Sequence, residues 1–508
     1  MSHARKRLLP NIASNVMALG FGVVVALWQT PYLMAWLGVE AYGQIYVLKY
    51  ISDYAFLLTF AITSTVYRFV AIEIDRDDYA AARRYFSSAF FGLLLIGLGL
   101  VTLAVLLRST LPGWIKTPAG LEAEVGGLLV LMMVSAAAVA VAAPFMSIPV
   151  AQHRFDRINV LRILGLSLQV SLLIALFTKL PSRLTHVGWA YAIKELSILA
   201  GLIVLARSLA PRLRPRWRDI EWRAICDMAG MSFWSIVDRL GFLLYFSIDL
   251  IIIPRHLGPA SCGRYAPIAQ MALMLSMLVF AIVNVFWPIA YEHIAKDRID
   301  ALVRHIQRTT KYVGLLLALP VGIICGLAGP ILTVWLGAEW VREASVVILL
   351  IAPLALNFSV RHLFSVTHAM NRVKIPALIM LAGGVLNLVL SVLLIQHTEL
   401  GVYGVALATG VALTLRNILA TPLYAAHITQ KPWHTFYRGL AFGPCATAVL
   451  VAAGILLSRM IAPYTLAGTA TAIVLITALY AVITFVLLSN DEKREIRSLL
   501  ARSSADPA

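Results

Sequence analysis

Long apolar runs recur along almost the whole chain, and they restrict its fold more than any other feature. Each run holds about twenty or more residues with few charges, the length that an α-helix needs to cross the hydrocarbon core of a bilayer. Runs bounded by charges or by Pro and Gly predict about fourteen spans. We place them at residues 10–36, 42–70, 84–107, 125–149, 159–179, 186–207, 225–253, 262–290, 310–336, 345–370, 375–396, 401–427, 436–459 and 463–489. The sequence therefore predicts an all-α polytopic membrane protein.

The basic residues predict how the chain is oriented in the membrane. Only 13% of the residues are charged, against about 25% in an ordinary soluble domain. The net charge of +17 would suit a nucleic-acid partner, but most Lys and Arg fall in alternate loops, as they do on the cytoplasmic side of membrane proteins. The densest basic segment, residues 207–223, lies in one of these loops. We therefore expect cytoplasmic N- and C-termini and no nucleic-acid partner.

The cysteines and the acidic clusters do not predict metal or catalytic chemistry. Cys226, Cys262, Cys325 and Cys445 stand singly in or beside apolar runs, without the spacing of metal ligands. The acidic segment at residues 75–78 is followed by two arginines and is interpreted as a solvated charge run. We therefore predict a transporter rather than an enzyme, with no catalytic residue, no metal site and no cofactor.

An internal repeat predicts two lobes. Residues 37–43 (LGVEAYG) match residues 257–263 (LGPASCG), 220 positions later (257 minus 37). A weaker match joins residues 187–190 to residues 403–406, 216 positions later (403 minus 187). Six spans per repeat would give two halves of the same orientation, related by an axis along the membrane normal, with a cleft between them. The predicted parts are an N-terminal lobe (1–208), a basic cytoplasmic linker (209–224), a C-terminal lobe (225–430), two further spans (431–490) and a cytoplasmic tail (491–508).

The seventh predicted span carries three carboxylates at intervals of eleven residues. Asp227, Asp238 and Asp249 would lie on one stripe of a continuous helix, because eleven residues complete just over three whole turns. A carboxylate at mid-membrane depth costs several kcal/mol unless it faces water or a partner. We therefore expect this helix to line a cavity, with Arg239 beside the stripe.

Cations at membrane depth predict an anionic ligand. Lys49 lies four residues before Asp53, and the two can also simply neutralise each other. Arg361 and Arg416 have no carboxylate within four residues, so each calls for an anion from another helix or from a ligand. The predicted phosphate- and sugar-binding residues are Lys49, Arg239, Arg361 and Arg416, and the predicted counter-ion or ion-coupling residues are Asp53, Asp238 and Asp249. Lys194 and Glu195, which are adjacent, point about 100° apart and do not form a simple face-to-face pair. We interpret them as candidate cavity or interhelix residues and favour a structural pairing between them.

Three stretches resemble the bacterial polysaccharide flippase family, which belongs to the multidrug, oligosaccharidyl-lipid and polysaccharide exporter superfamily. They are residues 15–46 (with LGVEAYG), residues 249–266 (DLIIIPRHLGPASCGRYA) and residues 400–409 (LGVYGVALAT). The resemblance implies two six-helix lobes around a V-shaped, cationic central cavity that opens alternately to either side. It implies a flippase that moves an undecaprenyl-pyrophosphate-linked oligosaccharide, an O-antigen or exopolysaccharide repeat unit, between the leaflets of the bacterial inner membrane.

The resemblance leaves other functions and partners open. A multidrug efflux antiporter of the same superfamily would depend on acidic rather than basic cavity residues, and a lipid II flippase would handle a chemically similar substrate. A membrane glycan polymerase or ligase is less favoured, because no loop has room for an extramembrane domain of about fifty residues. Membrane lipids and the polysaccharide polymerase and chain-length machinery are candidate partners. Coupling to H⁺ or Na⁺ is a further expectation.

Overall fold

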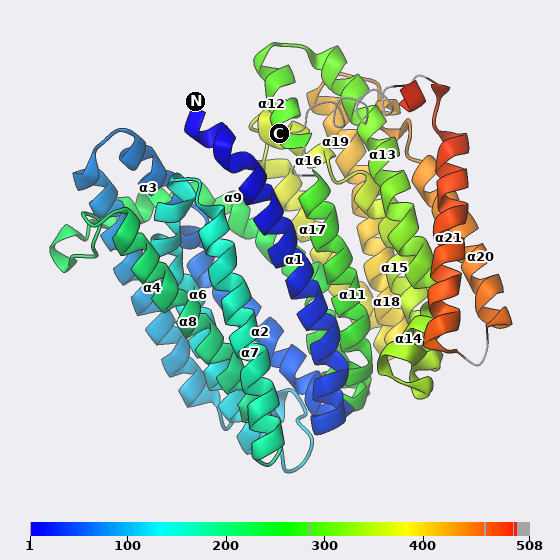
Figure 1. Ribbon diagram of the computed structural model, residues 1–508, viewed down its shortest axis with the longest axis horizontal. Helices are drawn as coiled ribbons and strands as arrows, with labels where there is room; N and C mark the ends of the chain where they lie inside the picture. Colours follow the sequence, from blue (N-terminus) through cyan, green and yellow to red (C-terminus); the bar gives the residue numbers. More distant parts are fainter. Residues whose placement is uncertain (1, 284–285, 462–463, 491, 495–508) are drawn as a thin grey trace. The chain divides into compact units, whose positions relative to one another are not determined.

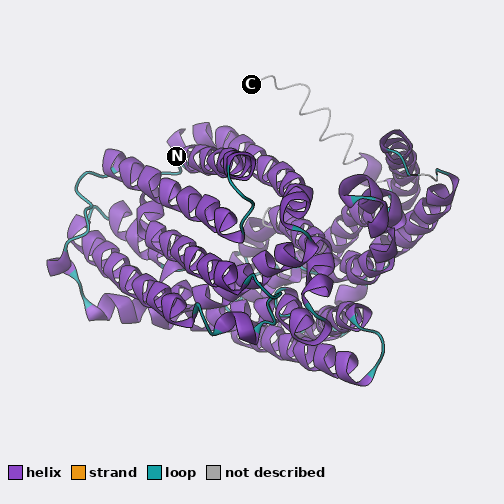
Figure 2. Cartoon of the chain, turned by 90° about the horizontal axis from the view of Figure 1, so that it is seen from below, coloured by secondary structure: helices purple, strands orange, loops and turns teal. Residues whose placement is uncertain are grey.

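The computed structural model describes residues 2–283, 286–461, 464–490 and 492–494, and all the regular secondary structure in these ranges is helical (Figure 2). The first elements are α1 (Ser2–Leu37), α2 (Val39–Thr63), α3 (Val66–Asp75), α4 (Tyr79–Leu107), α5 (Leu111–Trp114), α6 (Glu122–Ala151), α7 (Phe155–Lys179), α8 (Leu184–Leu209), η1 (Trp217–Asp219), α9 (Trp222–Phe246) and α10 (Asp249–Leu257). They are followed by α11 (Pro259–Val283), α12 (Trp287–Ala295), α13 (Ile299–Gly326), α14 (Ala328–Leu336), η3 (Ala338–Glu343), α15 (Ala344–Ser359) and α16 (Leu363–Ala369). The last are α17 (Lys374–His397), α18 (Val402–Thr414), η4 (Leu415–Ala420), α19 (Thr421–Ile428), η5 (Thr435–Tyr437), α20 (Phe442–Met460) and α21 (Leu466–Leu487).

The predicted all-α membrane fold is confirmed. Within the described residues, 13 helices are long and apolar enough to cross a membrane. They occupy the positions of every predicted span except the seventh. At that place α9 runs for 25 residues, but the charges of Asp238 and Arg239 make it less apolar than the others. The chain is therefore a multi-pass membrane protein with about fourteen spanning elements.

The chain forms two compact units whose boundaries differ from those of the predicted lobes. Unit 1 comprises residues 1–267 and 380–388, and unit 2 comprises residues 268–379 and 389–508. The element α9, predicted to open the second lobe, belongs to unit 1 because it packs against α2 and α4. The Ser232 hydroxyl on α9 donates to the Ala61 carbonyl oxygen at 2.6 Å. Gly241 on α9 lies so close to the backbone of Met380 that a Cβ there would approach it to 2.6 Å, which explains why part of α17 joins unit 1.

Unit 1 is organised around α6, which packs against α4 and α8, while α8 also packs against α7 and α7 against α1 (Figure 1). Phe86 on α4 and Phe145 on α6 meet edge to face, with ring centroids 5.2 Å apart, inside a core of buried aliphatic and alanine side chains. In unit 2, α13 takes the corresponding central place against α15 and α20. Gly314 on α13 and Gly443 on α20 allow the two backbones to touch, as small residues do at helix crossings in membranes.

The predicted repeat reappears in the backbone of the turns. Gly38 and Gly258 have φ of 83° and 87° and the same ψ of 165°, a conformation that strongly favours glycine. Two further pairs of left-handed residues recur at offsets of 220 and 218: Asp77 (φ 58°) with Asp297 (φ 51°), and His153 (φ 55°) with Asn371 (φ 54°). The backbone hydrogen bonds that close each turn recur at the same offsets.

The repeated glycines also meet each other in unit 1. Gly43 on α2 lies against Gly263 on α11, since a Cβ on Gly43 would come within 2.7 Å of the Gly263 nitrogen. A Cβ on Gly263 would in turn overlap the Val39 carbonyl oxygen. The two repeated motifs thus form a close helix crossing, which gives them a structural role.

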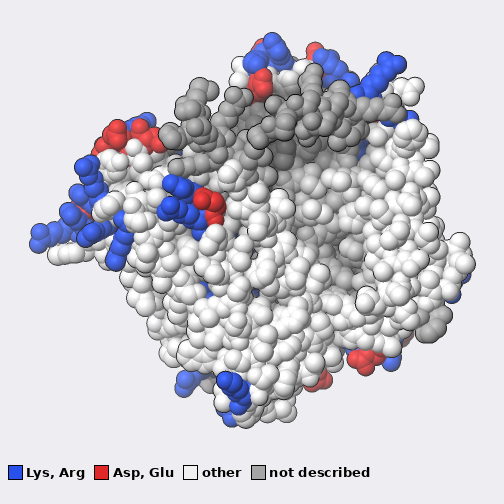
Figure 3. Space-filling view, viewed as in Figure 1, with Lys and Arg blue, Asp and Glu red and all other residues white. Residues whose placement is uncertain are grey.

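Charged side chains gather at the ends of the helices. On the face shown in Figure 3, Lys, Arg, Asp and Glu cluster at the ends, whereas the region between them is almost uncharged. The basic connection between α8 and α9 contributes one such cluster. Asp219 in this connection forms an ion pair with Arg83 on α4 at 2.6 Å. Side chains such as Leu95 and Val204, which are 73% and 68% exposed, lie along the helices, as expected for a surface that contacts lipid.

Candidate functional site

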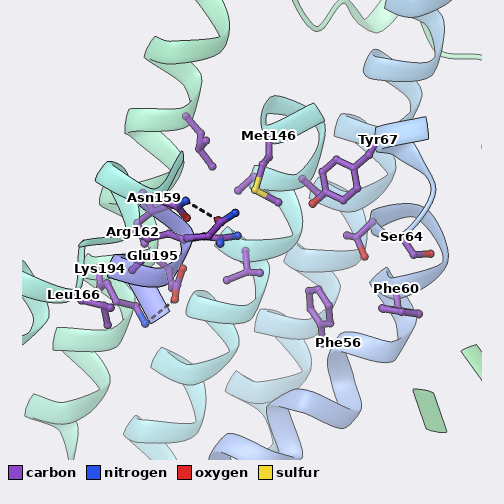
Figure 4. A pocket seen from close by; sticks show the side chains of 18 of the residues that line it. Phe56, Phe60, Ser64, Tyr67, Met146, Asn159, Arg162, Leu166, Lys194 and Glu195 are labelled. Carbon is purple, nitrogen blue, oxygen red and sulfur yellow. Dashed lines mark hydrogen bonds and ion pairs between the residues drawn. The ribbon is translucent and has the colours of Figure 1, made fainter. Parts of the chain in front are cut away.

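A cavity of about 660 Å³ lies within unit 1. Six helices line it: α1, α2, α3, α6, α7 and α8. Its volume falls in the range of about 300–1,000 Å³ that is typical of small-molecule sites. Figure 4 shows a polar wall from α7 and α8 facing a largely aromatic wall from α2 and α3.

The polar wall is built around Asn159 and Arg162. Asn159, which is 2% exposed, donates from Nδ2 to the Asn15 Oδ1 at 2.7 Å and to the Ser14 hydroxyl at 3.1 Å. These bonds join α7 to α1 and fix the start of α7. Arg162 follows one turn later and points into the cavity (Figure 4). Among the described residues its guanidinium has no hydrogen-bond or ion-pair partner, and it is exposed to the cavity. All its donors are therefore available to a ligand.

Lys194 and Glu195 complete the polar wall. Lys194 Nζ lies 2.8 Å from Glu195 Oε1, and the two side chains are only 13% and 19% exposed. Lys194 also lies over the Tyr191 ring, 5.0 Å from its centroid. The structural pairing favoured for these two residues is thus observed, because long flexible side chains can bend toward each other along the helix surface. The cavity therefore contains two cations and one carboxylate.

The facing wall offers flat apolar surfaces. Phe56 and Phe60 come from α2 and Tyr67 from α3, with Ser64 between the two helices (Figure 4). The Ser64 hydroxyl lies 3.0 Å from the Ser232 hydroxyl, which ties this wall to α9. A ligand in the cavity thus meets cationic groups on one side and aromatic rings on the other.

The predicted residues of span two lie beside this cavity-forming bundle but do not line the cavity. Asp53 is in electrostatic reach of both Lys49 and Arg239. Lys49 Nζ is 5.5 Å from the Tyr46 ring centroid, and the Arg239 guanidinium is 5.2 Å from the Phe242 ring centroid. These groups form a second charged cluster in unit 1.

The acidic stripe predicted for span seven is interrupted. The helix α9 ends at Phe246 and α10 begins at Asp249, so the three aspartates do not lie on one continuous helix. Asp227 is exposed and Asp238 is half-buried, whereas Asp249 is 3% exposed. The prediction of a common stripe was wrong for Asp249, because Ser247 leaves helical geometry at φ −120° and ψ −27°.

Asp249 is instead the centre of a buried polar network. Tyr265 donates to its Oδ2 at 3.0 Å, and Asn387 Nδ2 lies 3.3 Å from its Oδ1 and 3.0 Å from the Leu244 carbonyl oxygen. The hydroxyls of Tyr50 and Tyr54 are buried without a hydrogen-bond partner in the part of the chain that is described, and both are in electrostatic reach of Asp249. Oxygen atoms therefore concentrate where the helix is broken.

The other two predicted cations belong to unit 2. Arg361 donates from Nη1 to the Ser276 hydroxyl at 3.1 Å and lies 3.4 Å from the Phe280 ring centroid. Arg416, 9% exposed, lies in the π-helical turn η4 with its guanidinium 4.9 Å from the Phe364 ring centroid. π-Helical turns occur frequently at functional sites.

The sequence reasoning did not include Arg162. The sequence does contain an indication of this residue: Asn159 and Arg162 are spaced i, i+3 along α7. They lie on the side of the helix opposite Val160 and Leu164, which are 54% and 60% exposed. Helical periodicity therefore places both polar residues on the internal face.

Comparison with solved structures shows which known folds this architecture shares. An inward-facing multidrug resistance MATE family transporter of the MOP superfamily superposes with a TM-score of 0.69 at 10% identity, over 83% of this chain and 98% of that one. Lipid II flippase MurJ in an inward closed conformation gives 0.68 at 14% identity, over 94% of this chain and 98% of that one. At these identities the similarity establishes the fold: that of a MOP-type transporter.

The family follows from the sequence match. The family model described as "Polysaccharide biosynthesis protein" matches residues 8–293, more than half of the 508 residues, and the chain belongs to this family. The "Uncharacterized membrane protein EpsK" of Bacillus subtilis (strain 168) is 29% identical over 446 residues, which are 86% of this chain and 87% of that protein. The resemblance to polysaccharide flippases is thereby confirmed.

Proposed function

We propose that the protein is an alternating-access flippase for an undecaprenyl-pyrophosphate-linked oligosaccharide, the repeat unit of an O-antigen or exopolysaccharide. It would move this lipid from the inner to the outer leaflet of the bacterial cytoplasmic membrane, with both termini of the chain in the cytoplasm. The observation that supports this proposal most directly is the unit 1 cavity, where Arg162 and Lys194 face aromatic rings. Family membership supports the link to polysaccharide synthesis.

The chemistry of the cavity suits a sugar phosphate. A pyrophosphate loses its hydration on entering the membrane, and that loss is offset only by cations and hydrogen-bond donors. Arg162 offers a planar fork of donors suited to two phosphate oxygens. Lys194, which forms an ion pair with Glu195, supplies a second positive charge. Phe56, Phe60 and Tyr67 provide the apolar surface on which sugar rings can lie, while the polyprenyl chain remains in lipid.

The charge of the cavity favours this proposal over a multidrug antiporter. A multidrug antiporter that expels organic cations needs a cavity with excess negative charge, whereas this one holds two cations and one carboxylate. A lipid II flippase has the same requirement for cations, so charge does not discriminate against it. Growth of a deletion strain distinguishes these two, since loss of lipid II transport would stop growth and loss of a surface polysaccharide would not.

The test is translocation by the purified, full-length protein. Proteoliposomes containing a fluorescent undecaprenyl-pyrophosphate oligosaccharide report translocation as the fraction of probe that becomes accessible to dithionite. We expect Arg162→Ala to reduce the rate at least about tenfold, the loss of one charge-assisted contact, and Arg162→Lys to retain part of it. The matched control is Arg157→Ala, an exposed arginine on the same helix outside the cavity. Unchanged transport in Arg162→Ala would overturn the site.

The cations predicted outside this cavity remain part of the proposal. Arg239→Ala, Arg361→Ala and Arg416→Ala are each expected to lower the amount of surface polysaccharide at normal expression. Normal polysaccharide in all three variants would remove these arginines from the transport path, while leaving the unit 1 cavity to be judged by Arg162 alone.

We further propose that Asp249 couples transport to H⁺ or Na⁺. Broken membrane helices commonly place backbone carbonyls and carboxylates around a coupling ion, and Asp249, Asn387 and the Leu244 carbonyl meet at such a break. Transport driven by an imposed Na⁺ or H⁺ gradient should disappear in Asp249→Asn, while equilibrium binding of the probe remains. Gradient-driven transport that survives in Asp249→Asn would contradict the coupling role.

A further inference from the structure

A second cavity, of about 670 Å³, lies at one end of unit 2. The turn between α16 and α17 forms one side of it, and α19 with the turn that follows forms the other. The side chains that matter for its chemistry are Met370, Arg372, Ile375, Tyr424, His427 and Lys431. None of them belongs to the site proposed for transport.

Two similar chain reversals build this cavity. Asn371 and Gln430 have φ of 54° and 53°, left-handed conformations that commonly end helices. The next residue in each turn is a cation whose backbone N–H bonds back to the helix: Arg372 to the Thr367 oxygen at 2.7 Å and Lys431 to the Ala426 oxygen at 2.9 Å. The same local geometry therefore places one cation on each side of the cavity.

The cavity has an excess of positive charge. Lys431 Nζ is bound to Asp300 Oδ1 at 2.6 Å, so its charge is partly compensated. Arg372 is exposed and has neither an ion-pair nor a hydrogen-bond partner among the described residues. His427, which is also exposed, lines the same cavity. The guanidinium, the imidazole and the ammonium together suit a phosphate group.

Apolar side chains continue from the cavity along the same helices. Ile375 and Leu378 on α17 are 39% and 40% exposed, and Leu423 and Leu419, successive turns deeper on α19 and η4, are 41% and 50% exposed. Trp433, which is 67% exposed, lies just beyond Lys431, and tryptophan is enriched at membrane–water interfaces. The cations thus lie at the level of lipid headgroups, above a surface for acyl chains.

We propose that this cavity binds the headgroup of an anionic phospholipid from the adjoining leaflet. Basic pockets between membrane helices bind lipid phosphates in this way. The phosphate lies against Arg372 and His427, and one acyl chain lies over Ile375 and Leu423. A free phosphate ion would pair with the cations but would not cover the apolar surface beside them. A phospholipid would contact both, so we favour it as the source of the phosphate group. The proposal is independent of the transported substrate.

Native mass spectrometry of the purified full-length protein, titrated with phosphatidylglycerol, tests it. The wild type should bind at least one phosphatidylglycerol more tightly than phosphatidylcholine. Arg372→Gln should weaken the tightest binding about tenfold, and Arg372→Gln with His427→Ala should remove the preference for phosphatidylglycerol. Because the Arg372 side chain makes no polar contact with the described residues, Arg372→Gln should unfold at the same temperature as wild type in detergent without added lipid.

The control variant is Arg342→Gln, an exposed arginine of the same unit in η3, at the far end of α15 from this cavity. Equal loss of phosphatidylglycerol from Arg372→Gln and Arg342→Gln would overturn the site. Inorganic phosphate at about 10 mM, a concentration suited to a weak binding constant, should not displace phosphatidylglycerol. Displacement at that concentration would contradict the proposed lipid ligand and indicate a soluble phosphate instead.

Discussion

Replacing Glu195 by glutamine should tighten the binding of an anionic substrate rather than weaken it. Glu195 Oε1 lies 2.8 Å from Lys194 Nζ, and its negative charge repels any phosphate that enters the cavity. Glu195→Gln removes this repulsion, keeps the shape of the side chain and leaves Lys194 available to the ligand. The cavity would then hold two cations without an opposing carboxylate.

The size of the cavity sets the magnitude of the effect. A sphere of 660 Å³ has a radius of about 5.4 Å, so a phosphate at its centre lies about 8 Å from the Glu195 carboxylate once a contact distance of about 3 Å is added. Two unit charges 8 Å apart interact by about 2 kcal/mol at an effective dielectric constant of about 20. This energy corresponds to about a thirtyfold lower dissociation constant. Tighter binding should also slow release, so the turnover of Glu195→Gln in proteoliposomes should fall.

The assay is equilibrium binding of a short-chain polyprenyl-pyrophosphate saccharide to the protein in nanodiscs, followed by microscale thermophoresis. Glu195→Asp, which retains the charge, should bind within a fewfold of wild type. Glu292→Gln is the matched control, since Glu292 pairs with Lys296 on the surface of unit 2 with 61% and 51% of the side chains exposed. A folded Glu195→Gln protein whose affinity equals that of wild type, or is weaker, would refute the electrostatic reasoning.

Two further predictions concern stability. Gly241→Ala should lower the unfolding temperature, because the new Cβ would come within 2.6 Å of a neighbouring backbone and overpacking costs about 1–3 kcal/mol; Gly230→Ala on the same helix meets nothing within 4 Å and should not lower it. Burial alone would raise the pKa of the Glu492 carboxyl, but hydrogen bonds from Lys311 at 2.7 Å and from a nearby serine lower this pKa below its ordinary value. A lowered carboxyl pKa stabilises the folded state above the unfolded value of about 4.3 and ceases to do so as the pH falls through the folded pKa. Proteolysis of the C-terminal tail should therefore increase in acid, and at neutral pH in Glu492→Gln; equal cleavage of variant and wild type at neutral pH would contradict this anchoring role.

The sequence predicted the spans well because a membrane imposes a simple rule. A helix must be about twenty apolar residues long to cross it, and that length is visible in any single run. The repeat was visible for a related reason: Gly38 and Gly258 adopt a conformation that strongly favours glycine, so the sequence keeps them in register. In α9, by contrast, Asp238 and Arg239 indicated a functional span but also lowered its mean hydropathy.

The candidate site was much less predictable, because contact between helices is not encoded in one run of residues. Regular periodicity placed Asp249 on a stripe with two other aspartates, but the break at Ser247 turned it into the centre of a different network. Lys194 and Glu195 were candidate cavity or interhelix residues, but only the packing of several helices showed that they line the same cavity as Arg162. Neither result follows from helix geometry alone.

By itself, the sequence determined that this protein is an all-helical membrane protein with an internal repeat and with cations inside its spans, since hydropathy and glycine spacing are local properties. Only the tertiary structure decided which cations share a cavity with aromatic rings. Arg162 acquires that role because six helices from different parts of the chain enclose it. The enclosure depends on how close the helices approach, which is decided by the packing of small side chains such as Gly165 and Gly201 against their neighbours.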